Sequence, residues 1–231
     1  LLGGAIYQDA RGDDIGLVRA NIAAARELGV ELHEETHAQV TIADDHVTAT
    51  LPDGTIAKAR ALLLALGPWT DEVRTELGLP DRDLVGGTKG VHLEFSHDRL
   101  PLNNALALRH PDDSRVMFCV PEPERNRVLV GTTDTESDES PDALTVDAED
   151  VEYLMRAVQH LFPKLDLDES DIVDRWVGVR PLLQQQGSAS SRSREHGMVR
   201  EGNVLTIAGG KLTTYRDMAE EAVDLVGKML G

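Results

Sequence analysis

Residues 204–216 read Val204-Leu205-Thr206-Ile207-Ala208-Gly209-Gly210-Lys211-Leu212-Thr213-Thr214-Tyr215-Arg216. The first five residues are typical of a strand, and residues 214–229 have the spacing of a helix. A strand, a glycine turn and a helix in this order let a ligand approach the backbone and direct the first N–H groups of the helix at an anion. A nucleoside-triphosphate loop has Ser or Thr directly after its Lys, but Leu212 follows Lys211, so we exclude that function. An ordinary surface charge at Lys211 is the alternative interpretation.

A second glycine turn follows the run Ala61–Leu66, which contains no polar residue. Such a run predicts a strand that is buried on both faces, as in the centre of a parallel sheet. It leads into Ala65-Leu66-Gly67-Pro68-Trp69, where Gly67 permits close approach of a ligand and Pro68 fixes the direction of the chain. Because nucleotides bind at the carboxyl ends of parallel strands, this turn is a candidate cofactor contact, with a plain tight turn as the alternative.

The remaining pattern predicts a mixed fold with mostly antiparallel strands in its middle. Helices are expected over residues 14–28, 70–77, 147–162 and 214–229. Strands are expected over residues 30–33, 38–42, 46–51, 61–66, 90–95, 105–108, 116–120, 128–131, 172–179 and 204–208, with a hairpin turn at Asp53-Gly54. Residues 184–194, rich in Gln, Ser and Arg, and the acidic residues 134–142 are expected to form loops.

Two polar side chains on these predicted strands are candidates for chemistry. The alternation of residues 89–95 places His92 on the face opposite the apolar side chains. An imidazole titrates near neutrality and can accept a proton, although a lone strand histidine is more often a polar surface residue. Arg180 ends a largely apolar strand, so its guanidinium requires an anionic partner, either a protein carboxylate or an oxyanion of a substrate.

Composition excludes several functions. The chain has 23 basic and 41 acidic residues and a formal net charge of -18, a field that repels nucleic acid, so we expect no nucleic-acid partner. The single cysteine, Cys119, excludes an internal disulfide, and the eight histidines lack the spacing of a metal site, so we predict no metal. No apolar run approaches the roughly 20 residues that cross a bilayer. The start at Leu1 without a methionine is expected for a processed product or for a segment cut from a longer protein, and we favour the second.

Taken together, the motifs stand in an order that resembles the FAD-dependent (aerobic) glycerol-3-phosphate dehydrogenases. The resemblance runs from Gly3 to about Val226, and residues 209–216 are its most specific element. The residues that carry it are Ala65 to Trp69, Lys89 to His92, Gly131 to Asp134, Val179 to Leu182 and Gly209 to Arg216. It implies an α+β / α/β flavoprotein like D-amino-acid oxidase: part of a Rossmann-like FAD-binding domain at residues 1–85, a substrate-binding domain with a mostly antiparallel sheet at residues 86–182, and a return to the FAD-binding part with a C-terminal helix at residues 183–231.

The resemblance also implies an activity and the residues that carry it. In that family sn-glycerol 3-phosphate is oxidised to dihydroxyacetone phosphate by hydride transfer to FAD, and the electrons continue to quinone, or to oxygen in related oxidases. Matched positions assign catalysis to His92, Arg180 and Lys211, and substrate binding to Arg194 together with His92 and Arg180. The implied FAD contacts are Ala65, Gly67, Pro68, Trp69, Gly209, Gly210, Lys211, Leu212 and Thr213. A cytoplasmic location is implied, with peripheral contact to the inner face of the cell membrane through other parts of the protein and a homo-oligomer as open alternatives.

The sequence also departs from that family. It contains no Gly-x-Gly-x-x-Gly followed by an acidic residue, so the pyrophosphate lacks its usual cradle, and the C-terminal helical domain of many members is not matched. We therefore expect the isolated chain to bind FAD weakly and to be inactive. Two other functions stay open: an amino-acid or amine oxidase of the same superfamily, which needs a carboxylate-binding arginine but no phosphate site, and a non-catalytic interaction module.

Overall fold

The computed structural model describes residues 3–137, 139–184 and 195–231, and the chain divides into two compact units, Leu1–Ala59 and Arg60–Gly231. The first unit contains helix α1 (Asp14–Glu27) and an antiparallel meander, β1 (Gln39–Ile42), β2 (Val47–Thr50) and β3 (Ile56–Ala59). The expected hairpin turn joins β2 to β3. The expected strand at residues 30–33 is wrong: Gly29, at φ +85°, ends the helix, and the residues that follow it have no strand partner in the described part of the chain.

Helix α1 begins as predicted, but its apolar side chains are not packed into a core. The Asp13 carboxylate caps it by accepting a hydrogen bond of 2.8 Å from the Gly16 N–H. Its apolar residues Ile15 and Val18 are exposed, and the helix buries no residue. Local capping and spacing therefore determine that this helix forms, while its apolar face contributes nothing to a core within the unit.

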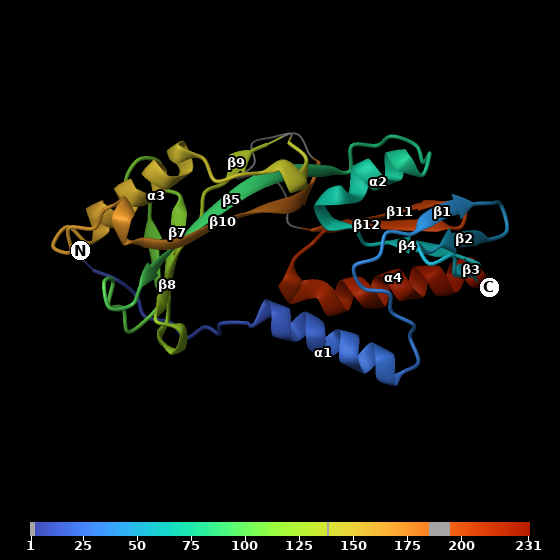
Figure 1. Ribbon diagram of the computed structural model, residues 1–231, viewed down its shortest axis with the longest axis horizontal. Coiled ribbons are helices and arrows are strands. Elements are labelled where there is room, and N and C mark those ends of the chain that lie inside the picture. The colour runs from blue at the N-terminus through green and yellow to red at the C-terminus, as the bar shows by residue number, and fades with distance from the viewer. Residues whose placement is uncertain (1–2, 138, 185–194) are drawn as a thin grey trace. The chain divides into compact units, whose positions relative to one another are not determined.

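The second unit is built around one long antiparallel sheet, as the sequence predicts. Its strands lie in the order β10-β5-β8-β7-β6, and β9 pairs with the start of β5 (Figure 1). The strands are β5 (Val85–Ser96), β6 (Leu106–Arg109), β7 (Val116–Glu122), β8 (Arg127–Gly131), β9 (Thr135–Glu136) and β10 (Ile172–Leu183). The two glycines at 86 and 87 lie inside β5, and the acidic stretch contains β9, so it is not simply a loop.

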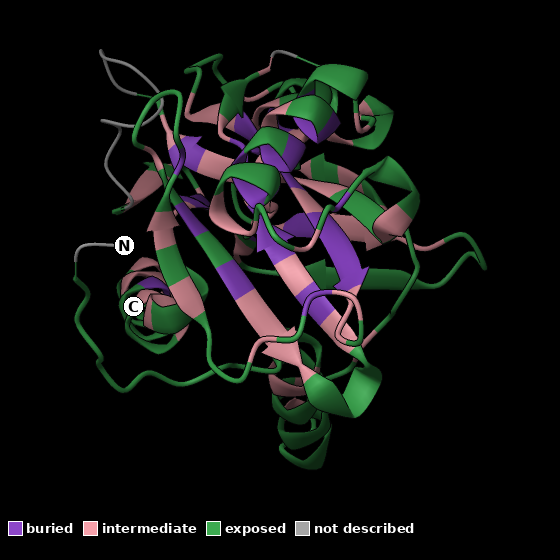
Figure 2. Cartoon of the chain, turned by 90° about the vertical axis from the view of Figure 1, so that its left-hand side faces the viewer, coloured by how far each residue is buried: buried purple, intermediate pink, exposed green. Residues whose placement is uncertain are grey.

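Helix α3 (Ala148–Leu161) covers one face of this sheet, and the core lies between them. Figure 2 shows buried residues both on the helix and on the strands. The core comprises Val91, Leu93, Phe95, Leu100, Met117, Cys119, Val128, Val130, Val151, Leu154, Met155, Ala157, Val158 and Leu167. Lys89 shares the apolar face of β5, where it forms ion pairs with Asp147 and, at 2.7 Å, with Asp150 at the start of α3. These two carboxylates satisfy the buried ammonium group.

A second, smaller sheet has the strand order β11-β12-β4 and contains β4 (Leu62–Leu64), β11 (His196–Glu201) and β12 (Val204–Gly209). Strands β4 and β12 are parallel, whereas β11 and β12 are antiparallel. The expectation that β4 is buried on both faces is wrong: β4 lies at the edge of the described sheet, and Leu63 is 40% exposed while Leu64 is buried. Strand β11 has no counterpart in the sequence prediction.

Two helices follow the strands of the small sheet. Helix α2 (Thr70–Glu76) follows β4, and α4 (Tyr215–Leu230) follows β12 and contacts it. Arg74 on α2 is buried and donates hydrogen bonds to Thr206 Oγ1 at 2.7 Å and to the Pro80 carbonyl at 2.8 Å. Its Nη1 also lies 2.9 Å from Glu201 Oε2, so a buried ion pair ties α2 to the sheet.

Candidate active site

The face of the long sheet opposite α3 carries a transverse row of four residues from four strands. Strand pairing places Phe118 beside Gly131, Gly131 beside His92, and His92 beside Trp176. The side chains of Phe118 and Trp176 are 46% and 41% exposed. We call this surface the open face, and its centre is the predicted site residue His92.

The imidazole of His92 is held between its two neighbouring strands. It stacks on Trp176 with ring centroids 4.2 Å apart and an angle of 17° between the planes. On the other side, Gly131 provides the space, because a Cβ at that position would lie 2.2 Å from His92 Cδ2. Nδ1 of His92 is buried and has no hydrogen-bond partner among the described residues. Burial, and secondarily the charge of Arg180, lowers the pKa of His92 to about 4, so the ring is neutral at neutral pH.

Arg180 lies on the same face and has a protein carboxylate as partner. A Cβ at Gly90 would lie 2.7 Å from both Nη atoms, so this glycine makes room for the guanidinium. Nη2 donates to Thr132 Oγ1 at 2.9 Å, and Nη1 lies 3.4 Å from Asp134 Oδ1 and 3.3 Å from the Thr133 carbonyl. Of the two partners that the sequence left open, the structure thus shows the carboxylate, and Arg180 remains partly exposed.

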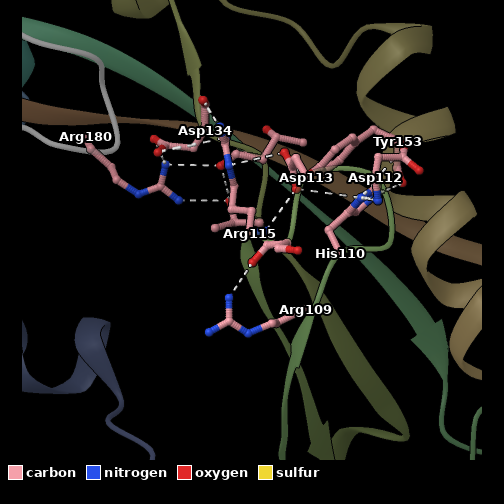
Figure 3. Close-up of polar contacts among 11 residues, drawn as sticks. Arg109, His110, Asp112, Asp113, Arg115, Asp134, Tyr153 and Arg180 are labelled. Carbon is pink, nitrogen blue, oxygen red and sulfur yellow. Dashed lines mark hydrogen bonds and ion pairs between the residues drawn. The ribbon is translucent and has the colours of Figure 1, made fainter.

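A chain of polar contacts continues behind Asp134 (Figure 3). Arg115 donates to the Asp134 carbonyl at 2.7 Å and lies 4.0 Å from its carboxylate. Asp113 accepts from the Arg115 backbone N–H at 3.0 Å and from the Tyr153 hydroxyl at 3.0 Å. Burial, and secondarily the hydrogen bond to Asp113, raises the pKa of Tyr153 to about 12, so this hydroxyl stays a donor. These side chains also line a cavity of about 530 Å³ between the start of β5 and α3.

The predicted cofactor contacts lie together at one end of the small sheet. Because β4 and β12 run parallel, their carboxyl ends lie at the same end of the sheet, where the segment Ala65–Trp69 and the segment Gly209–Thr213 follow them. Gly67, Gly209 and Gly210 have φ values of +56°, +74° and +91°, which L-residues rarely adopt. The predicted helix start is preceded by a 3-10 turn, Leu212–Thr214.

Strand β10 connects the open face to this end of the small sheet. Leu183, three positions after Arg180, packs against the glycine turn, where a Cβ at Gly209 would lie 2.9 Å from its Cγ. Trp69 donates from Nε1 to Asp142 at 3.2 Å, so the turn at Gly67 is tied to the segment that follows β9. Lys211 is exposed, and the contacts of His92 and Arg180 described above do not include it. Arg194, predicted to face the substrate, lies outside the described residues.

Thr132, Asp134 and Trp176 are among the contributors to the open face that were absent from the predicted site residues. Thr132 and Asp134 stand in the quoted motif Gly131-Thr132-Thr133-Asp134, whose place directly after a strand was the available signal. Trp176 lies opposite His92 on the neighbouring strand, and a single sequence does not reveal how two strands are aligned. No group of three or more His, Cys, Asp or Glu residues in the described ranges is arranged to hold a metal ion. Nor does any helix there combine the length and apolar character that crossing a membrane requires.

Solved structures define the class of this fold. The glycerol-3-phosphate dehydrogenase from Bacillus halodurans, complexed with FAD, matches with a TM-score of 0.82 and 30% sequence identity, over 95% of this chain and 44% of that one. The L-alpha-glycerophosphate oxidase from Mycoplasma pneumoniae with FAD bound has a TM-score of 0.64 over 89% of this chain and 53% of that one, and at 15% identity it supports the fold alone. The class is therefore the FAD-binding flavoprotein oxidoreductases.

The sequence comparisons give the family. The aerobic glycerol-3-phosphate dehydrogenase of Staphylococcus aureus (strain USA300) is 33% identical over 240 residues, which cover 100% of this chain and 43% of that protein. The model of the FAD dependent oxidoreductase (DAO) family matches residues 1–216, and the chain belongs to this family. This match confirms two predictions from the sequence, the fold class and FAD as the cofactor of the family. The chain spans less than half the length of the curated relatives it matches.

Proposed function

We propose that this chain forms the substrate-facing part of a flavoenzyme that oxidises sn-glycerol 3-phosphate to dihydroxyacetone phosphate. The observation that carries the proposal is a neutral His92 near Arg180 on the open face, where each of the two side chains lies in space left by a glycine of the neighbouring strand. The relative at 33% identity, named as an aerobic glycerol-3-phosphate dehydrogenase, supports this choice of substrate.

We assign the first proton transfer to His92. Oxidation of a secondary alcohol at C2 requires a group that takes the hydroxyl proton, and a neutral imidazole can accept it. Because the charge of Arg180 contributes to the low pKa of His92, an anionic substrate beside Arg180 would partly cancel that charge. The pKa of His92 would then rise toward the range in which a general base is most effective.

The cationic residues are assigned to the negative charges of the reaction. Arg180 is held at the open face by Thr132 and Asp134, from where its guanidinium would stabilise charge that develops on the substrate oxygen. We propose the same role toward oxygen or flavin for Lys211, and phosphate binding for Arg194, on the basis of matched family positions alone. These three roles require that Arg180, Lys211 and Arg194 all approach the same substrate.

The region at the carboxyl ends of β4 and β12 has features that suit FAD. Its glycines at 67, 209 and 210 have positive φ values, so the backbone is bare there, and Lys211, Leu212 and Thr213 are exposed just before α4. We propose that Ala65, Gly67, Pro68, Trp69 and residues 209–213 contact the cofactor, which when bound supplies the acceptor for the C2 hydride. Because the pyrophosphate motif is missing from this sequence, we propose that the isolated 231-residue chain binds FAD weakly and is inactive.

The domain limits and the electron acceptor also remain proposals. We assign residues 1–85 and 183–231 to the FAD-binding part and residues 86–182 to the substrate-binding part; the pairing of β4 with β12 supports joining the two outer segments. We further propose quinone as the acceptor of the electrons and a cytoplasmic location with peripheral membrane contact. Comparing a soluble quinone analogue with oxygen as acceptor in steady-state assays tests the first of these.

The decisive experiment uses the flavin-loaded protein as its gene encodes it. Mixed without oxygen with glycerol 3-phosphate, it should lose the visible absorbance of oxidised flavin, whereas D-alanine and L-proline should leave it unchanged. His92→Ala should slow this reduction at least ~100-fold. The matched control is His160→Ala, on an exposed position of α3, which should react like the unmodified protein. Reduction by the amino acids but not by glycerol 3-phosphate would refute the proposed substrate.

A further inference from the structure

Asp134 occupies a particular place relative to the site, because its carboxylate lies between two arginines. Oδ1 lies 3.4 Å from Nη1 of Arg180, and Oδ2 lies 4.0 Å from Nη1 of Arg115. The side chain of Asp134 is 19% exposed, and the residue lies three positions after Gly131, the last residue of β8. Figure 3 shows the side chains of Arg180 and Arg115 both pointing toward it.

Arg115 fixes Asp134 at the carboxylate oxygen that does not face Arg180. Its Nη1 donates to the Asp134 backbone carbonyl at 2.7 Å, so both the main chain and the side chain of Asp134 are attached to the same guanidinium. Arg115 is fixed in turn by Asp113, which lies 3.7 Å from its Nε and is bonded to Tyr153 on α3. The position of Asp134 is therefore set by the helix that packs on the core.

We propose that Asp134 is a positioning residue that holds the Arg180 guanidinium over Gly90, on the same face of the sheet as the imidazole of His92. This inference rests on the proposed function, because it concerns the geometry of that same site. A long arginine side chain on an open face has many rotamers, and without an anchor it would lose them only when the substrate binds. Asp134 and Thr132 order the guanidinium beforehand, so the substrate meets a charge that is already in place.

A positioning role has a signature that a merely structural role lacks. If Asp134 acts through Arg180, replacing it should weaken binding of the product in the native background but change nothing further once Arg180 is alanine. If it only stabilises the segment between β8 and β9, the loss should be the same in both backgrounds. A double-mutant cycle separates these cases.

The cycle is measured on the flavin-loaded, gene-encoded protein, with dihydroxyacetone phosphate as the calorimetric ligand, so the readout does not depend on turnover. Asp134→Ala should raise the Kd for dihydroxyacetone phosphate about tenfold or more in the native background. The same substitution should raise this Kd less than about twofold in the Arg180→Ala background. Asp134→Asn, which is nearly isosteric, repeats the measurement with less risk to folding, and Asp134→Glu should restore part of the affinity. In parallel, kcat/KM for glycerol 3-phosphate should fall between tenfold and a hundredfold in Asp134→Asn.

The matched control is Asp112→Asn. Asp112 also forms an aspartate–arginine pair, 3.0 Å from Arg156 Nε, but has no contact with Arg180 among the described residues, so its Kd and kcat/KM should match the unmodified protein. Equal losses in both backgrounds, or no loss in either, would overturn the inference alone, since the unmodified protein would still bind the product. If the unmodified protein binds no dihydroxyacetone phosphate and is not reduced by glycerol 3-phosphate, the proposed function fails and this inference with it.

Discussion

The substitution Gly131→Ala tests whether the space under His92 is needed for function. The new Cβ would lie 2.2 Å from Cδ2, 2.7 Å from Nε2 and 2.8 Å from Cγ of the imidazole. Ordinary contact begins at 3.4 Å, so the ring has to move by about 1.2 Å. The ring lies against Trp176 from the neighbouring strand, which limits the directions in which it can move.

This displacement converts into an expected loss of rate. A misplacement of about 1 Å of a reacting group costs on the order of a hundredfold, so kcat/KM for glycerol 3-phosphate should fall between tenfold and a hundredfold in Gly131→Ala. Overpacking should lower the free energy of unfolding by about 1 kcal/mol, since the ring is only partly enclosed and can give way. Initial rates and urea denaturation of the flavin-loaded, gene-encoded protein measure the two effects separately.

The control is another strand glycine, Gly197→Ala. A Cβ there would meet Leu183 Cδ2 at 3.4 Å, which is an ordinary contact. We therefore expect kcat/KM to change by less than twofold and the free energy of unfolding by about 0.5 kcal/mol or less. If Gly131→Ala keeps kcat/KM within twofold of the Gly197→Ala value while remaining folded, the position of His92 in this structure has no catalytic importance. The reasoning from glycine-made space to a proton-accepting imidazole would then be refuted.

Two further predictions concern stability. Arg74→Met should lower the free energy of unfolding by about 2 kcal/mol in urea denaturation, because Thr206 loses its buried partner and Glu201 keeps only the half-exposed Arg82; a loss below ~1 kcal/mol would show that the ion pair is dispensable. His92 should make stability depend on pH: its folded pKa of about 4 lies below the ordinary 6.5, so the unfolded chain binds the additional proton, and stability should decrease as pH falls from 6.5 toward 4. That decrease, on the order of 3 kcal/mol, should be absent in His92→Gln, and identical pH profiles of the two proteins would contradict the low pKa.

Much of the fold follows from local sequence, and the failures occur where long-range pairing decides. The sequence predicts α3 and the alternation of β5 correctly, because period and capping are local properties. The run that forms β4 reads as fully buried, but burial depends on neighbours on both sides, and in the described sheet β4 has only β12. The exposed apolar face of α1 is a second case, because periodicity shows which face is apolar but not what covers it.

The same distinction applies to the candidate site. His92 and Arg180 stand out in the sequence because polar groups on apolar strands need an explanation, and the structure brings them together on neighbouring strands. The carboxylate partner of Arg180 was not identifiable, because Asp134 is one of several acidic residues in its stretch and only tertiary structure selects among them. Gly90 and Gly131 were visible in the motifs, but their role, space for a neighbouring side chain, depends on strand register.

The parallel pairing of β4 with β12 has a consequence for biosynthesis. Arg74 follows β4, and its hydrogen-bond partner Thr206 on β12 stands 132 positions later in the chain. As the polypeptide leaves the ribosome, the long antiparallel sheet can therefore form while β4 still lacks its partner β12, and unpaired strand edges are sites of mispairing. The carboxyl ends of β4 and β12 come together only when β12 has been translated, so chaperone demand for this part of the chain should be greatest in the interval before β12 emerges.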